Sequence, residues 1–339
     1  MMAAAGEMPL VTVRDLHVGF PLAQSMFGPA RSWVRAVDGV SFSVPRGETL
    51  ALVGESGCGK TTTARALLRL VPATSGAVSF DGIDVLALRP EPLRRLRRRM
   101  QLVFQDPYSS LNPRRTVGDS IGEGLLIHHL ASGDAADARV RQSLEEVGLH
   151  PDFARRYPYE LSGGQRQRVG IARALAVEPE FIVCDEPVSA LDVSVQAQII
   201  NLLQDLQRDH ALTYLYIAHD LAIVAQVATH VAVMYFGRIV ELGRTASVFQ
   251  VPLMPYTRAL LASVLVPDPA APRTRVVLAG ESPSPATPPP GCPFHPRCPD
   301  PRKDAACTST IPPLEEKSPG HFAACIKEPV RPPDIPVPS

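Results

Sequence analysis

The chain has 339 residues, and its 34 basic and 34 acidic side chains give a net charge of zero. That length suffices for one large α/β domain with a smaller appendage, and the balanced charge argues against a nucleic-acid-binding surface over the whole fold. No apolar run reaches the roughly 18 to 20 residues that cross a bilayer, and residues 1–9 lack the features of a signal peptide. These features predict a cytosolic protein whose membrane role would come through partners.

Two stretches near the N-terminus have strand character. Residues 10–20 are rich in β-branched side chains and predict an edge strand, and residues 34–44 resume the pattern after a loop rich in proline, glycine and serine. An aromatic ring ahead of a nucleotide site can stack on adenine. Phe20 is the first candidate and Trp33 the second, although a core or surface role explains either ring equally well.

The central motif is a glycine-rich loop between a buried apolar run at 49–53 and a helical pattern from Thr62 onward. The loop consists of Gly54, Glu55, Ser56, Gly57, Cys58, Gly59, Lys60 and Thr61. Its glycines let backbone N–H groups converge on an anion, and the positive end of the helix reinforces the attraction. Lys60 is expected to reach the β- and γ-phosphates of ATP, and Thr61 to offer a hydroxyl to Mg²⁺. Thr62 completes the predicted phosphate site.

A basic run and a glutamine follow. Residues 93–99 hold five arginines, which could face phospholipid or RNA but more often form a solvated helix face. The next apolar run, 100–104, predicts a buried strand that ends at Gln105. A glutamine leaving a strand near a bound phosphate can orient the attacking water and contact Mg²⁺, although many strands end in polar residues.

Residues 116–156 show helical periodicity, with Val140, Leu144 and Val147 on one face and Gly148 ending the helix. A second glycine-rich helix start follows, comprising Leu161, Ser162, Gly163, Gly164 and Gln165. Ser162 is suited to cap this helix, whose N–H groups form a second anion site.

Two carboxylates follow four apolar residues in the strand predicted at 181–187. Asp185 and Glu186 lie at the carboxyl edge of a buried parallel strand, where α/β sheets carry their sites. Asp185 can hold Mg²⁺ through its water shell, and Glu186 can act as general base on the attacking water. After a further strand at 212–218, His219 could donate a hydrogen bond to the γ-phosphate, although a lone histidine there is usually a surface residue.

This ordered set of motifs, with Ser189, Ala190, Leu191 and Asp192, resembles the nucleotide-binding subunit of an ATP-binding cassette (ABC) transporter over roughly residues 10–250. The resemblance implies a P-loop α/β fold with a parallel-sheet core, an N-terminal antiparallel β subdomain, a helical subdomain and a C-terminal extension. The implied domains are 8–250, with the helical part at about 106–168, and 251–339.

The resemblance also implies partners. Two such domains sandwich two ATP molecules, so residues 161–165 would serve the nucleotide on the partner's phosphate loop and residues 189–192 would line the dimer interface. The second ATPase is expected to be a related, non-identical chain. Gln105 and the following helical segment would contact two membrane-spanning permease subunits, placing the protein at the cytoplasmic face of the membrane. No nucleic acid partner is expected.

The C-terminal segment narrows the resemblance. Pro255-Tyr256-Thr257, the segment 280–285 and the run from Pro288 to Cys298 resemble the extension of oligopeptide and dipeptide importer ATPases, except that Met254 stands where that family often has histidine. This implies peptide import served by an extracytoplasmic binding protein. Importers of nickel, glutathione and some peptide antibiotics share the extension, so these cargoes remain alternatives.

Twenty of the 35 prolines lie between Pro267 and Pro338, which predicts neither regular helix nor central sheet there and a core not built by apolar packing. Four of the six cysteines lie in the same part: Cys292, Cys298, Cys307 and Cys325. In a cytosolic chain, clustered thiols more often bind metal than form disulfides, although the close pairs typical of zinc are missing. The importer family is known to carry a [4Fe-4S] cluster here, so the resemblance implies these four ligands. Zn²⁺ with His295 replacing one cysteine is the alternative, and four unliganded thiols the third possibility.

Two other classes of function remain open. A non-transport ABC ATPase acting on DNA or the ribosome would carry a coiled-coil insertion or tandem cassettes, and the chain has neither pattern. An iron-sulfur redox sensor would make the ATPase secondary to the cysteine segment. The leading hypothesis is an ATPase that powers peptide import.

Overall fold

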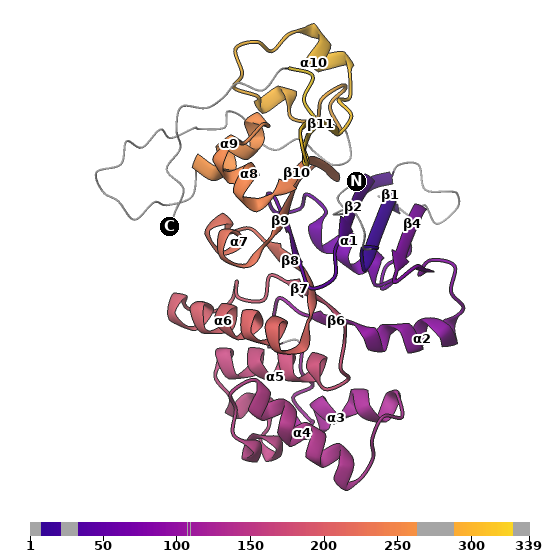
Figure 1. Ribbon diagram of the computed structural model, residues 1–339, viewed down its shortest axis with the longest axis vertical. Helices are drawn as coiled ribbons and strands as arrows, with labels where there is room; N and C mark the ends of the chain where they lie inside the picture. The colour runs from indigo at the N-terminus through magenta and orange to yellow at the C-terminus, as the bar shows by residue number, and fades with distance from the viewer. Residues whose placement is uncertain (1–7, 22–32, 107, 109, 263–287, 328–339) are drawn as a thin grey trace. The chain divides into compact units, whose positions relative to one another are not determined.

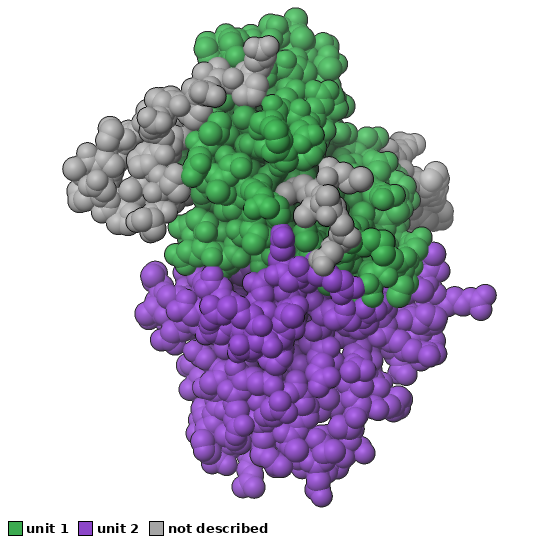
Figure 2. Space-filling view, viewed as in Figure 1, with its two compact units in different colours: residues 1–45, 49–86, 218–339 green, residues 46–48, 87–217 purple. Residues whose placement is uncertain are grey.

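The computed structural model describes residues 8–21, 33–106, 108, 110–262 and 288–327. It divides into two compact units (Figure 2), which are described separately. Unit 1 comprises residues 1–45, 49–86 and 218–339, and unit 2 comprises residues 46–48 and 87–217. The strands and helices of each are labelled in Figure 1.

An antiparallel sheet forms the N-terminal part of unit 1. Its strands run in the order β2-β1-β4-β5. They are β1 (Val11–Pro21), β2 (Trp33–Val44), β4 (Ser75–Phe80) and β5 (Ile83–Asp84). The expectation that β1 is an edge strand is wrong, because β2 pairs with one side of it and β4 with the other. Val11, Val13 and Leu16 of β1 are buried, but the alternation is interrupted at Arg14 and Asp15, which are both exposed. The pairing register with β2 shifts between Val13 and Leu16, and Asp15 has φ +45°, as in a β-bulge.

A second set of strands in unit 1 begins with the strand that carries the glycine-rich loop. The strands are β3 (Thr49–Val53), β9 (His230–Tyr235), β10 (Arg238–Arg244), β12 (His321–Ala323) and β11 (Glu315–Ser318). β3 is parallel to β9, and the remaining pairs are antiparallel. The C-terminal extension therefore adds two strands to this sheet. The expectation that this proline-rich segment holds no regular helix and no central strand is wrong. Its short strand β12 lies between β10 and β11, and residues 305–309 form a short helix, because neither stretch contains a proline.

The helices of unit 1 are short. They are α1 (Lys60–Leu67), α7 (Leu221–Val227), α8 (Thr245–Gln250), α9 (Pro255–Ala262) and α10 (Ala305–Ser309), with a 3₁₀ turn at His295–Arg297. Contrary to expectation, the extension does contribute apolar packing. Phe294 is 1% exposed, and its ring centroid lies 5.3 Å from those of both Tyr235 and Tyr256. One aromatic residue among the prolines is sufficient to build this contact.

Unit 2 is built around three parallel strands, in which β7 (Phe181–Asp185) pairs with β6 (Met100–Val103) on one side and β8 (Thr213–Ala218) on the other. Every residue of β7 and β8 is buried, as continuous apolar runs predict. The helices are α2 (Pro90–Arg99), α3 (Val117–Ile127), α4 (Asp134–Glu146), α5 (Gly163–Leu175) and α6 (Val193–His210).

Helical periodicity predicted the packing of this unit. In and just after α4, Val140, Leu144 and Val147 are buried, and α3, α4 and α5 contact one another. On α2 the leucines Leu93 and Leu96 are buried, Arg94 and Arg95 are exposed, and residues 97–99 are half-buried arginines, so only part of the basic run forms a solvated face. Among the described residues, none of the helices combines the length and apolar character needed to cross a membrane.

Candidate functional site

The glycine-rich loop of unit 1 fits its place only because two positions lack a side chain. A Cβ on Gly54, whose φ is +151°, would lie 2.1 Å from the carbonyl oxygen of Met234. A Cβ on Gly59, whose φ is +107°, would lie 2.2 Å from the carbonyl oxygen of Ala36. Both glycines are therefore required for the loop to pass against β9 and β2.

Lys60 is 5% exposed and begins α1. Its Nζ donates hydrogen bonds to the carbonyl oxygens of Gly54 (2.8 Å) and Glu55 (3.0 Å), so the ammonium group lies across the curve of the loop. Cys58 lies beneath it with its Sγ 3.8 Å from Nζ, and burial raises the pKa of this thiol. The cation thus faces the concave side of the loop, where an anion would bind.

The start of α1 supplies the rest of the predicted phosphate site. Gly59 occupies the N-cap in a left-handed conformation, and no side chain caps the helix. Thr61 and Thr62 lie in the first turn, where the helix dipole attracts negative charge. Loop, lysine and helix start are thus assembled within one unit as predicted from the sequence.

Both candidate adenine-stacking rings are exposed at one end of the β1–β2 hairpin. Phe20 is 41% exposed and pairs with Val34, while Trp33 is 55% exposed and pairs with Pro21. Trp33 lies over Gly19, where an added Cβ would meet its ring at 3.2 Å. Stacking on adenine remains a prediction for either ring.

At the carboxyl end of β7, unit 2 brings Gln105 and Glu186 together. The Gln105 amide Nε2 donates to Glu186 Oε2 at 2.9 Å, although the two residues are 81 positions apart. Glu186 has φ +46°, a left-handed conformation, and its N–H donates to the carbonyl of Ile217 at 3.1 Å. Asp185 beside it is only 2% exposed. The sequence predicted each of these residues separately, and the structure adds the contact between Glu186 and Gln105.

The second glycine-rich helix start, at α5, is capped by Ser162 as predicted. The Ser162 hydroxyl accepts from the N–H of Gln165 (3.3 Å), and the Gln165 side chain accepts from the N–H of Ser162 (3.0 Å). This reciprocal pair is a capping box. An added Cβ on Gly164 would lie 2.5 Å from Val195 Cγ1, so Gly164 lets α5 approach α6. Leu161 is buried before the cap, and Gly163 lies beside Leu191.

Residues 189–192 form a tight turn between β7 and α6. The Ser189 hydroxyl donates to the Glu186 carbonyl (3.1 Å), and the Gln196 amide donates to the carbonyls of Val188 and Leu191. Asp192 caps α6 by accepting from the N–H of Val195, and hydrogen bonds, first that from the Ser194 hydroxyl, lower the pKa of its carboxyl. Ala190 is exposed at the tip of the turn.

The predicted residues are divided between the two units. The phosphate loop and the exposed His219 belong to unit 1, and Gln105, Asp185, Glu186 and residues 161–165 belong to unit 2. That these groups converge on one nucleotide remains a prediction from the sequence.

The sequence analysis missed two arginines that hold the Gln105 segment against α5. Arg173 donates to the Ser110 carbonyl at 2.6 Å, and its burial lowers the pKa of its guanidinium. Arg166 stacks over the ring of Tyr108 at 4.0 Å and donates to the Pro158 carbonyl. The two arginines are seven residues apart on one helix, two turns on the same face, and this spacing was the available signal.

Arg297 and Tyr256 were also missed. Arg297 NH1 donates to Glu55 Oε2 (2.7 Å) and NH2 to Oε1 (2.9 Å), while the Glu55 N–H donates to the Tyr256 hydroxyl (2.9 Å). The pKa of Tyr256 is raised, chiefly by burial. Because Glu55 and Arg297 are 242 positions apart, no local pattern could have joined them.

The four C-terminal cysteines lie near one another but do not form a finished metal site. The Cys292 N–H donates to the Cys307 carbonyl at 2.9 Å, and burial raises the pKa of Cys292 to about 11, with smaller contributions from the other three thiols. Among the described residues, however, no group of three or more His, Cys, Asp or Glu side chains is arranged to hold a metal ion. The segment 280–285 of the predicted extension lies outside the described residues.

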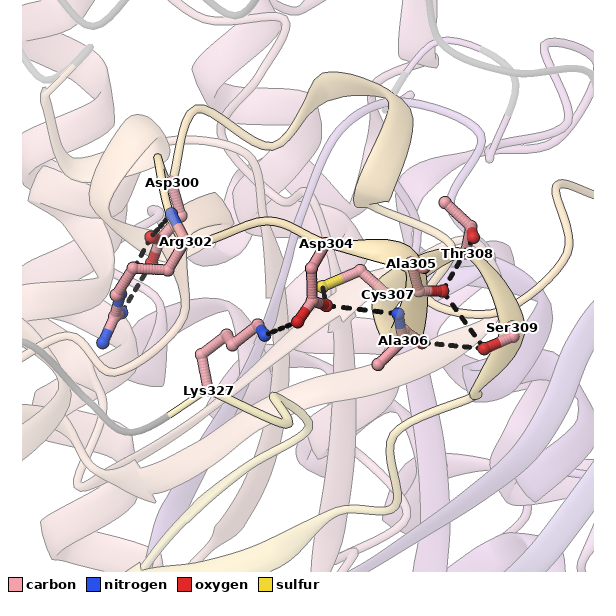
Figure 3. A network of polar contacts seen from close by, with 9 residues as sticks. All are labelled: Asp300, Arg302, Asp304, Ala305, Ala306, Cys307, Thr308, Ser309 and Lys327. Atoms are coloured by element: carbon pink, nitrogen blue, oxygen red, sulfur yellow. Dashed lines mark hydrogen bonds and ion pairs between the residues drawn. The ribbon is translucent and has the colours of Figure 1, made fainter.

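Polar contacts fix the backbone that carries Cys307 (Figure 3). Asp304 accepts from the Ala306 N–H at 3.2 Å and from Lys327 at 2.6 Å, and the Cys307 thiol lies 3.7 Å from the same carboxylate. Nearby, Arg302 lowers the pKa of Asp300 to about 2. His295 Nδ1 donates to the Cys292 carbonyl at 2.9 Å, so its Nε2 carries the lone pair when the ring is neutral.

Comparison with known proteins places the motifs in a family. Residues 37–189 match the ABC transporter family, and residues 240–307 match the family described as oligopeptide/dipeptide transporter, C-terminal region. A putative peptide import ATP-binding protein of Brucella ovis is 50% identical over 322 residues, which cover 95% of this chain and 99% of the relative. The oligopeptide transport ATP-binding protein AppF of Bacillus subtilis is 49% identical over 327 residues, covering 96% and 99%.

Solved structures confirm the predicted fold class. A dimeric ATP-binding cassette in a post-hydrolysis state with ADP and Pi has a TM-score of 0.62 and 27% identity, covering 69% of this chain and 98% of that one. CbiO1 of Clostridium perfringens, part of the transporter complex cbiONQ, has a TM-score of 0.61 and 27% identity, covering 72% and 91%.

Proposed function

This chain belongs to the family of ABC transporter ATP-binding subunits with an oligopeptide/dipeptide transporter C-terminal region, and we propose that it hydrolyses ATP to drive peptide import. The observation that carries the proposal is the joint presence of a complete phosphate loop, Gly54 to Thr61, and the C-terminal region matched at 240–307. The names of relatives whose alignments cover 95% and 96% of this chain favour peptides over nickel, glutathione or a peptide antibiotic as the cargo. They also favour transport over a DNA-acting, ribosomal or redox-sensing ATPase.

Each predicted site residue has a chemical role in the proposal. Lys60 and the loop N–H groups bind the β- and γ-phosphates, and His219 reaches the γ-phosphate. The Thr61 hydroxyl, the Asp185 carboxylate and the Gln105 amide supply the oxygen donors that Mg²⁺ prefers. Glu186 takes the proton of the attacking water while Gln105 orients it.

The assembly is part of the proposal. A second, related ATPase chain would cover the nucleotide with its own counterpart of residues 161–165 and meet this chain at residues 189–192. ATP binding then closes the pair, hydrolysis reopens it, and the free-energy difference is passed to two permease subunits that receive peptides from an extracytoplasmic binding protein. The chain would lie peripherally at the cytoplasmic face of the membrane.

Replacement of the proposed base tests this function. Glu186→Gln keeps the shape of the side chain and should leave Mg·ATP binding intact while lowering turnover by about 100-fold or more, because general-base assistance is lost. ATP hydrolysis and peptide uptake are measured on the complex assembled with its permeases. Glu178→Gln, which changes an exposed carboxylate of the same unit, should retain full activity. Unchanged hydrolysis in Glu186→Gln would refute the assignment.

We also propose that Cys292, Cys298, Cys307 and Cys325 ligate a [4Fe-4S] cluster. Four thiols on a small, partly buried segment suit such a cluster in number and kind. Zn²⁺ bound by His295 and three of the cysteines is the alternative. Anaerobic purification followed by iron, sulfide and zinc analysis decides between them: a brown protein with four irons supports the cluster, whereas a colourless one with stoichiometric zinc excludes it. Cys307→Ser should lower the metal content, and Cys184→Ser, in buried β7, should not.

A further inference from the structure

Glu55, the second residue of the phosphate loop, is where the C-terminal extension meets the loop. Its N–H donates to the Tyr256 hydroxyl, and its carbonyl accepts from the Cys58 N–H (3.3 Å) and from Lys60 Nζ (3.0 Å). Both oxygens of its carboxylate accept from Arg297. One residue thus connects the lysine that binds phosphate to two side chains beyond position 250.

Arg297 holds Glu55 with high geometric specificity. Its guanidinium makes two nearly parallel hydrogen bonds to the carboxylate, at 2.7 and 2.9 Å, and its side chain is 9% exposed. A two-pronged contact of this kind is stronger and more directional than a single ion pair. Arg297 is largely shielded from water and the Glu55 side chain is 29% exposed, so solvent would compensate only in part for the loss of the pair.

Packed aromatic rings and buried hydrogen bonds hold Arg297 and Tyr256 in place. The Tyr235 and Tyr256 rings lie 4.6 Å apart, both pack on Phe294, and the Tyr235 hydroxyl lies 3.5 Å from Arg297. Glu241 fixes the chain just before α9 by accepting from the N–H groups of Leu253 (2.8 Å) and Met254 (2.9 Å). Arg297 and Tyr256 are therefore held by packing that does not depend on the loop.

The charge of Glu55 explains why the extension matters for ATP. A carboxylate in a loop that gathers N–H groups around phosphate would repel a triphosphate if it were unpaired. Arg297 neutralises that charge and fixes the direction of the peptide that accepts from Lys60. We propose that Arg297 and Tyr256 are positioning residues through which the C-terminal extension sets the affinity of the phosphate loop for Mg·ATP, acting through Glu55.

The test uses the full-length chain and the assembled transporter. Arg297→Ala should weaken Mg·ATP binding by about tenfold, measured by calorimetric titration, because the Glu55 carboxylate loses both hydrogen bonds from Arg297. In the transporter, KM for ATP should rise by a similar factor while kcat changes by less than about twofold, since the reacting groups are untouched. Arg302→Ala, in the same extension but paired with Asp300, should leave affinity within about twofold of the parent.

A double variant separates this role from a general loss of structure. Adding Glu55→Gln to Arg297→Ala removes the carboxylate charge that Arg297 no longer neutralises and should restore most of the lost affinity. Arg297→Lys keeps the charge but not the paired hydrogen bonds to Glu55, so its affinity for Mg·ATP should lie between those of the parent and Arg297→Ala. Tyr256→Phe should lose less affinity than Arg297→Ala. Unchanged affinity in Arg297→Ala, or no recovery in the double variant, would overturn the proposal. If Arg297→Ala does not fold, Arg297→Lys compared with Glu55→Gln/Arg297→Lys gives the same decision.

Discussion

The two glycine-rich helix starts of this protein, at α1 and α5, use the same physical device but are held in different ways. Gly59 begins α1 without any side-chain cap, whereas Ser162 and Gln165 cap α5 through reciprocal hydrogen bonds three residues apart. The α1 loop is braced by Arg297 and Tyr256 from the far end of the chain. A helix start that must offer its N–H groups to phosphate therefore gains its order from distant contacts, and one with a capping serine gains it locally.

The largest expected effect on stability concerns Glu241, the residue of β10 that binds the C-terminal extension. Glu241 is fully buried and accepts from Leu253, Met254 and the His321 ring, the last at 2.8 Å. Glu241→Ala leaves these donors without an acceptor and should lower the free energy of unfolding of the folded chain by about 3–5 kcal/mol. Urea unfolding measures the loss.

A surface carboxylate of the same extension is the control for that experiment. Glu315 pairs with Lys317 at 2.8 Å but its side chain is 57% exposed, so Glu315→Ala should cost less than about 0.5 kcal/mol. Equal losses of unfolding free energy in the two variants would mean that burial does not determine how firmly the extension is held. The α1 loop, which the extension supports, would then no longer differ from α5 in the way described.

Two glycines of α5 test how this locally capped helix packs against α6. An added Cβ on Gly164 meets Val195 at 2.5 Å, and one on Gly170 meets nothing within 4 Å. Because valine is stiff in a helix, Gly164→Ala should lower the free energy of unfolding by about 1–3 kcal/mol. Gly170→Ala should instead raise it by about 0.5–1 kcal/mol through better helix propensity. Thermal unfolding of both variants checks the opposite signs, and a stabilised Gly164→Ala would contradict the packing described.

The smallest expected effect concerns pH and a long-range contact in unit 2. Hydrogen bonds from Arg99, with a smaller contribution from Arg46, hold the pKa of Glu180 below its ordinary value of 4.5. Because the folded pKa lies below the unfolded one, the contribution of Glu180 to stability is present above pH 4.5 and disappears as pH falls through the folded pKa. Its side chain is 39% exposed, so that contribution should be less than about 1 kcal/mol.

The measurement is the stability difference between the parent and Glu180→Gln at two pH values. The difference should be detectable at neutral pH and shrink as pH falls through the folded pKa of Glu180, because the parent's carboxyl then also becomes uncharged. A difference that grows on acidification would show that the sign is wrong.

The sequence by itself determined the chemistry of this protein and its local order. The spacing from Gly54 to Thr61 predicted the phosphate loop, and Ser162 predicted the capped helix, since both signals come from residues close together in the chain. The reciprocal hydrogen bond to the Gln165 side chain was found only in the structure. The acidic end of β7 was recognisable for the same reason, because a short apolar run reveals a buried parallel strand.

Only the tertiary structure decided what lies across from these elements. The hydrogen bond between Gln105 and Glu186, the interior position of β1, and the fork of Arg297 on Glu55 all join residues far apart in the chain. Periodicity and capping are properties of neighbouring residues, whereas contacts over such separations depend on how strands pair and helices pack. For that reason the sequence predicted the parts of the nucleotide site, and the fold alone revealed that the C-terminal extension holds its phosphate loop.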